Sequence, residues 1–186
     1  MRATVERAEA LRLLKIEHQA VEALVAELSD EEMTRGDTIQ HGLYYDQECS
    51  FKDLLAHLVC YEVYTVEALG EWRAGKKHWA IDAVKEPRRG REIHYGGIAE
   101  RAHLSLREQL DEYRQTGGAL EAAISALSEA DWRMAAPWDG GRDTDLGGMI
   151  EGIMVLPPRP MYRHLPVHVP DARLYSQPAL GGEPGS

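Results

Sequence analysis

The chain of 186 residues is 44% hydrophobic and 28% charged, which is typical of a globular protein with one continuous core. Its 31 acidic and 21 basic residues give a net charge of −10, which argues against nucleic acid as a partner. No apolar run approaches the roughly 20 residues that cross a membrane, and acids among the first ten residues are atypical of a signal peptide. We therefore expect a cytoplasmic protein that does not bind membranes.

The first predicted helix covers residues 4–28, where apolar side chains alternate three and four positions apart. His18 falls on its inner stripe, and we interpret it as a hydrogen-bonded histidine between two helices. Residues 34–48 contain turn-forming residues without a sustained period and are predicted to connect this helix to the next. The two cysteines, Cys49 and Cys60, form neither a disulfide framework nor a zinc motif.

The second predicted helix begins after Ser50, because Ser50 and Asp53 have the spacing of a capping box, and it ends near Gly75. His57 stands at the edge of its inner stripe. Glu62 stands near the centre of that stripe, where a carboxylate needs a partner or a raised pKa. The stripe consists of Phe51, Leu55, Leu58, Glu62, Val66, Leu69 and Arg73.

Residues 76–97 are polar and basic, and we predict a solvated loop that could also help to bind an anionic substrate. A long third helix is predicted over residues 98–127, with a bend or weak point at Gly117 and Gly118. A fourth helical segment follows the expected cap Thr144 and is interrupted by prolines at positions 157, 158 and 160. The connections at 34–48 and 76–97 are candidate lids.

A weak internal repeat relates the two halves of the chain. Residues 28–33 and 127–132 are similar, and each segment is followed by a loop and a capping residue, Ser50 or Thr144. His57 and Glu151 stand seven positions after these caps and would face a shared interior. The sequence therefore predicts an all-α, up-down four-helix bundle over residues 1–175, with an irregular fourth helix and a disordered tail at 176–186.

His164 and His168 have the i, i+4 spacing that places two imidazoles on one helical face, a common arrangement for a divalent metal. Pro166 lies between them and removes one backbone donor. A metal held by three neutral imidazoles and water would keep an open coordination position, as catalytic metal sites require. Glu62 and Glu151 are the candidate acids that would orient a ligand or move a proton.

The sequence segments 51–58 and 168–173, together with the pair His164 and His168, resemble the DinB-like superfamily of four-helix bundles. The resemblance implies a divalent metal, zinc or nickel and also iron, held by His57, His164 and His168. It further implies relatives that transfer or isomerise with a low-molecular-weight thiol, and metal-free relatives that hydrolyse reactive natural products.

Three hypotheses for the function remain open at this point. The first is a metal-dependent transferase, isomerase or hydrolase that acts on a small electrophilic molecule. The second is a metal-free resistance or binding protein, which sequesters or hydrolyses a reactive natural product. The third is an interaction module, for which a homodimer is the candidate assembly. The aromatic residues expected to line a substrate pocket are Tyr61, Trp72, Trp138 and Tyr162.

Overall fold

The computed structural model describes residues 1–36, 39, 49–138, 143–154 and 164–169. Every regular element within these ranges is a helix, which confirms the predicted all-α class. The helices are α1 (Arg7–Glu27), α2 (Asp30–Thr34), α3 (Phe51–Arg73), α4 (Ala80–Ala83), α5 (Pro87–Arg101), α6 (Leu106–Ser125), α7 (Glu129–Trp132), α8 (Leu146–Met154) and α9 (Leu165–His168). The predicted tail and the three prolines at 157, 158 and 160 lie outside the described ranges. Within them, no helix is both long and apolar enough to cross a membrane.

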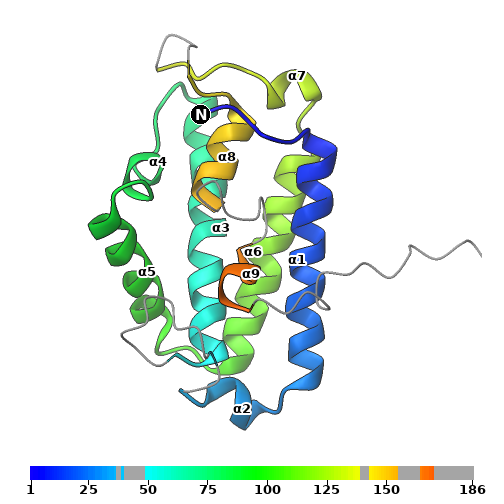
Figure 1. The fold of residues 1–186 in the computed structure, drawn as a ribbon, viewed down its shortest axis with the longest axis vertical. Coiled ribbons are helices and arrows are strands. Elements are labelled where there is room, and N and C mark those ends of the chain that lie inside the picture. The colour runs from blue at the N-terminus through cyan, green and yellow to red at the C-terminus, as the bar shows by residue number, and fades with distance from the viewer. Residues whose placement is uncertain (37–38, 40–48, 139–142, 155–163, 170–186) are drawn as a thin grey trace, which may run out of the picture.

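The long helices α1, α3 and α6 lie side by side (Figure 1). Helix α1 runs in one direction along the molecule, and α3 and α6 both run in the other, because α5 returns the chain to the starting end between them. Helix α3 contacts α6, α5 and α8, whereas α1 packs against α6. The short helix α9 packs into the interior through Leu165, which is fully buried among residues of α1, α3 and α6. Helix α3 is therefore the element that the other helices surround.

Both ends of α3 are fixed by local backbone chemistry, as the sequence predicts. The Ser50 hydroxyl accepts a hydrogen bond from the Asp53 amide at 3.0 Å, and the Ser50 amide donates to the Asp53 carboxylate at 2.9 Å. At the other end Gly75 has a φ of 73°, and the Lys76 amide donates to the Glu71 carbonyl at 2.9 Å. The rotation of His57 about the helix axis follows from this fixed start.

The predicted loop at 76–97 is wrong, because most of this segment forms α4 and the first part of α5. Pro87 starts α5, where its fixed φ suits a helix and its missing N–H removes no hydrogen bond. Helix α5 lies against α3 at Gly97, where an added Cβ would lie 2.8 Å from the Cys60 side chain. The basic run that the sequence analysis places in a loop therefore belongs to the first turns of α5.

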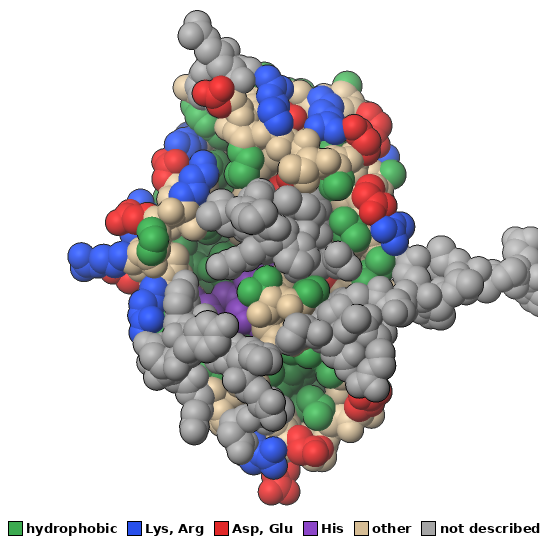
Figure 2. All heavy atoms as spheres, viewed as in Figure 1, with side chains coloured by type: hydrophobic (Ala, Val, Ile, Leu, Met, Phe, Trp, Pro, Cys, Tyr) green, Lys and Arg blue, Asp and Glu red, His purple; other side chains and the backbone are tan. Residues whose placement is uncertain are grey.

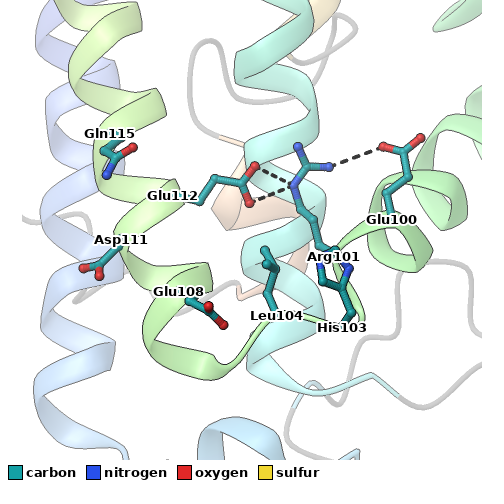
Figure 3. Close-up of a pocket in the computed structure, with 8 residues that line it drawn as sticks. All are labelled: Glu100, Arg101, His103, Leu104, Glu108, Asp111, Glu112 and Gln115. Carbon is teal, nitrogen blue, oxygen red and sulfur yellow. Dashed lines mark hydrogen bonds and ion pairs between the residues drawn. The ribbon is translucent and has the colours of Figure 1, made fainter.

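The single helix predicted over residues 98–127 is also wrong, because α5 ends at Arg101 and α6 begins at Leu106. Ser105 caps α6 through a capping box with Glu108. Across the break, Arg101 Nε donates to both carboxylate oxygens of Glu112, at 3.1 and 3.0 Å (Figure 3). This ion pair ties the end of α5 to the first turns of α6.

Three other predicted boundaries change in the structure. Ser29 and Ser128 each begin a short helix, α2 and α7, through a capping box, rather than only closing the helix before it. Asp145, and not Thr144, caps α8, because its side chain accepts from the Gly148 amide at 2.8 Å. The two similar segments, residues 28–33 and 127–132, therefore contain the capped starts of two short helices, α2 and α7.

Helix α6 continues through Gly117 and Gly118 without a break. The two glycines differ in their surroundings. A Cβ on Gly117 would lie 2.8 Å from Cε1 of His18 on α1, whereas a Cβ on Gly118 would meet nothing within 4 Å. Gly117 therefore allows α1 to approach α6 closely at His18.

We predict that Gly117→Ala lowers the free energy of unfolding by about 1–2 kcal/mol, because the new methyl group displaces a histidine ring that two hydrogen bonds hold. The matched control Gly118→Ala should raise it by about 0.5–1 kcal/mol through helix propensity. Urea unfolding of both variants measures the difference. Equal effects of the two substitutions would contradict the close packing of His18 on Gly117.

Candidate metal centre

Three buried histidines from two helices and one helix cap meet inside the protein. His57 lies on α3, His164 precedes the first residue of α9, and His168 is its last residue. Their exposed fractions are 2%, 5% and 7%. Figure 2 shows histidine atoms at the surface on the face that carries α9.

The cluster is close enough to share one ion. His57 Nε2 lies 3.0 Å from His164 Nε2, and one ligand nitrogen from each of the three residues lies within 4.8 Å of the others. The rings of His164 and His168 are stacked with centroids 5.2 Å apart, and both stand nearly perpendicular to the His57 ring. The sequence prediction that these three histidines converge is confirmed.

The donor set fits a divalent transition metal. Metal–imidazole bonds of about 2.0–2.1 Å place two ligand nitrogens roughly 3 Å apart, which is the separation between His57 and His164. Uncharged imidazole suits zinc, nickel and iron alike. These three residues could therefore hold a metal ion, and their chemistry does not select one metal.

Pro166 does not disrupt the histidine pair. It occupies the first turn of α9, where a proline costs no helical hydrogen bond because the N–H groups there have no acceptor within the helix. The Val169 amide closes the turn by donating to the Leu165 carbonyl at 2.8 Å. One helical turn is sufficient to bring His164 and His168 to the same side.

Two further aromatic side chains border the cluster. The ring of Tyr61, one of the predicted pocket residues, lies 4.8 Å from both the His57 and the His164 rings. The ring of His94, on α5, lies 4.0 Å from that of His57. His94 is not predicted from the sequence, because residues 76–97 are predicted to be a loop and a loop has no defined inner face.

Glu17 is a second residue near the cluster that the sequence does not predict. It lies on α1, is 1% exposed, and its Oε2 accepts a hydrogen bond from the Leu165 amide at 2.9 Å. Burial raises the pKa of Glu17 to about 8, although the amides of His164 and Leu165 oppose this shift. The sequence feature that indicates its burial is its position, because Glu17 lies on the same buried stripe of α1 as Ala10, Leu14 and Val21.

Glu62 forms a hydrogen bond with His18. Glu62 Oε1 lies 2.8 Å from His18 Nε2, and Glu121 Oε1 lies 2.6 Å from His18 Nδ1. A carboxylate on each ring nitrogen favours the imidazolium, since only this form carries two N–H groups. The predicted hydrogen-bonded histidine on the first helix is confirmed, and Glu62 has the partner that its buried position requires.

The charges of this cluster follow from burial and hydrogen bonding. Burial alone would lower the pKa of His18, but the hydrogen bonds to Glu121 and Glu62 outweigh it and raise the pKa to about 10. Burial raises the pKa of Glu62, whereas the hydrogen bond from His18 lowers that of the half-buried Glu121. The two hydrogen bonds therefore keep His18 charged at neutral pH.

Glu151 forms hydrogen bonds with Thr4 and Val5, which precede α1. Its Oε1 accepts from the Thr4 amide at 2.8 Å, the Thr4 hydroxyl at 3.0 Å and the Val5 amide at 3.2 Å. These bonds hold the segment before α1 against α8. The catalytic roles proposed for Glu62 and Glu151 stay predictions, and the contacts of both residues are structural.

The predicted aromatic pocket is divided. Trp72 packs against Trp138 with ring centroids 4.8 Å apart, about 16 Å along α3 from Tyr61. Tyr162 lies outside the described residues. Among the predicted pocket residues that the structure describes, Tyr61 is therefore the one whose ring contacts the clustered histidines.

Two clefts lie apart from the three histidines. One, of about 510 Å³, lies between the end of α5 and α6, and Arg101 in it pairs with Glu112 on one side and Glu100 on the other (Figure 3). The other, of about 450 Å³, is mainly apolar and is lined by Trp72, Arg73, Gly75, Ala126, Leu127, Asp131, Met134, Ala135, Pro137 and Leu146. None of the three clustered histidines lines either cleft.

No protein-family model matches the chain, and no curated protein matches it. Among solved structures, the chain is similar to an uncharacterised protein from Escherichia coli UTI89, with a TM-score of 0.69 over 92% of each chain. The two sequences are 13% identical, so this similarity shows a common fold and says nothing about function.

The raised pKa of His18 predicts how stability depends on pH. A group whose pKa is higher in the folded state stabilises the fold fully below its unfolded pKa of 6.5 and loses this effect as pH rises through about 10. Between pH 6.5 and pH 10.5 the parent should lose on the order of 3 kcal/mol more than His18→Gln. Urea unfolding at both pH values measures this, and a constant difference between the two proteins would contradict a charged His18.

Proposed function

We propose that this protein is a divalent-metal-dependent enzyme that acts on a small electrophilic molecule by thiol transfer, isomerisation or hydrolysis. The observation that carries this proposal is the convergence of His57, His164 and His168 inside the helical core. Buried polar side chains are costly, so three imidazoles gathered at one point favour a ligand-binding role over a packing role. Zinc and nickel are the first candidates, and iron is the third.

His57, His164 and His168 would hold the metal. With three protein ligands, a bound metal keeps an open position and lowers the pKa of a water or thiol at that position, which supplies a nucleophile at neutral pH. The residues around the metal would form the walls of the site and exclude bulk water. Tyr61 and His94 border the imidazoles, and the surrounding helices limit the access of bulk water.

We also propose that the chain belongs to the DinB-like superfamily. The origin of the ligands supports this, because one comes from the second long helix and two come from near the end of the chain. In this interpretation α8 and α9 together take the place of the fourth helix of the bundle. A low-molecular-weight thiol is then the candidate co-substrate.

The proposal predicts close to one metal ion per chain. Elemental analysis would be done on protein purified without a histidine tag or chelator and then incubated with zinc or nickel. The parent and His103→Ala, a substitution of an exposed histidine away from the cluster, should retain the metal. His57→Ala and His168→Ala should each lose most of it.

Two results would contradict the proposal. The parent could hold no metal after incubation, or the two ligand variants could hold as much metal as His103→Ala. Circular dichroism of each variant provides the control that the helices are intact, so that loss of metal reports the site.

A second candidate, a metal-free protein that binds an apolar small molecule, is favoured by the apolar cleft beside Trp72. In that case apolar compounds should raise the melting temperature in the presence of chelator. Trp72→Leu should reduce this effect, and His57→Ala should leave it unchanged. Stabilisation that requires metal instead would support the first candidate.

A further inference from the structure

Helix α9 is too short to fix its own orientation. It has four residues, and its cap residue His164 makes no side-chain hydrogen bond to the helix. The first N–H groups of any helix lack acceptors within it, so they need acceptors from elsewhere. The orientation of His164 and His168 therefore depends on what the rest of the protein offers to α9.

Glu17 supplies that acceptor from α1. Its Oε2 accepts a hydrogen bond from the Leu165 amide at 2.9 Å. The contact joins residues 148 positions apart and is buried. In the short helices α2 and α7 the same function is performed by the local serines Ser29 and Ser128.

We propose that Glu17 is a positioning residue of the metal centre, which orients α9 so that His164 and His168 face His57. This inference rests on the proposed function. The buried Leu165 side chain fixes the depth of α9 in the core, but an apolar contact has no direction. The hydrogen bond from the Leu165 amide to Glu17 adds the direction, because it weakens steeply when donor and acceptor are misaligned.

The chemistry of Glu17 supports this role over simple packing. A buried carboxyl group, neutral or charged, costs free energy that leucine at the same position would not. Glu17 differs from the nearby carboxylates, because Glu62 and Glu121 both bond to His18. Substitution of a residue that orients metal ligands typically weakens metal binding by about 10–100-fold.

The test compares zinc affinity, measured by competition with a chromophoric chelator, among the parent and three variants. Glu17→Leu should weaken zinc binding by about 10–100-fold, because it removes the acceptor. Glu17→Gln should stay within about threefold of the parent, since the amide oxygen can still accept from α9. Glu121→Leu is the matched control, because it removes a carboxylate that bonds to His18 instead, and it should bind zinc like the parent.

The visible absorption of bound cobalt(II) gives a second readout, because it reports the arrangement of the ligands. The spectrum should change in Glu17→Leu and be retained in Glu17→Gln. If Glu17→Leu does not fold, Glu17→Met, which keeps the length of the side chain, takes its place in both measurements.

The outcomes separate this inference from the proposed function. A parent that binds no zinc overturns both. A parent that binds zinc, together with Glu17→Leu or Glu17→Met that binds it equally well, overturns the positioning role alone. Glu17→Gln that binds as weakly as Glu17→Leu also overturns it, because the acceptor would then not be the feature that matters.

Discussion

The burial of three imidazole rings at one point is the constraint on which the rest of this structure depends. His57 Nε2 and His164 Nε2 lie 3.0 Å apart inside the helical core, and each ring gives up hydration to be there. Such an arrangement persists only if both chain segments that carry the rings are fixed. The capped start of α3 fixes one segment. The buried Leu165 and the carboxylate of Glu17 fix the other, which has one helical turn of its own.

The core contains histidines in two different chemical settings. His18 lies between the carboxylates of Glu62 and Glu121, which favour its charged form and join α1, α3 and α6. The three clustered histidines lie instead against one another and against aromatic rings, and charging all of them at such distances would be repulsive. A metal binds the neutral form of imidazole, so the second setting suits a metal and the first suits a structural ion pair.

The sequence predicts those features that depend on nearby residues. Ser50 and Gly75 fix the ends of α3 through partners within a few positions, and the spacing of His164 and His168 is sufficient to place both on one side of a turn. Helix α5 was missed because its contact with α3 depends on a glycine close to a cysteine and gives little apolar periodicity. The hydrogen bond from the Leu165 amide to Glu17 is not predicted from the sequence, because the two residues are 148 positions apart. The residues around Glu17 do not specify which amide it accepts from.

X-ray absorption at the metal edge of the zinc-loaded protein tests the central claim most directly, because it identifies the atoms bonded to the ion. The account predicts three imidazole nitrogens at about 2.0–2.1 Å, and loss of part of this imidazole signal in His57→Ala. A metal surrounded by oxygen or sulfur, or a spectrum that His57→Ala leaves unchanged, would contradict a three-histidine centre.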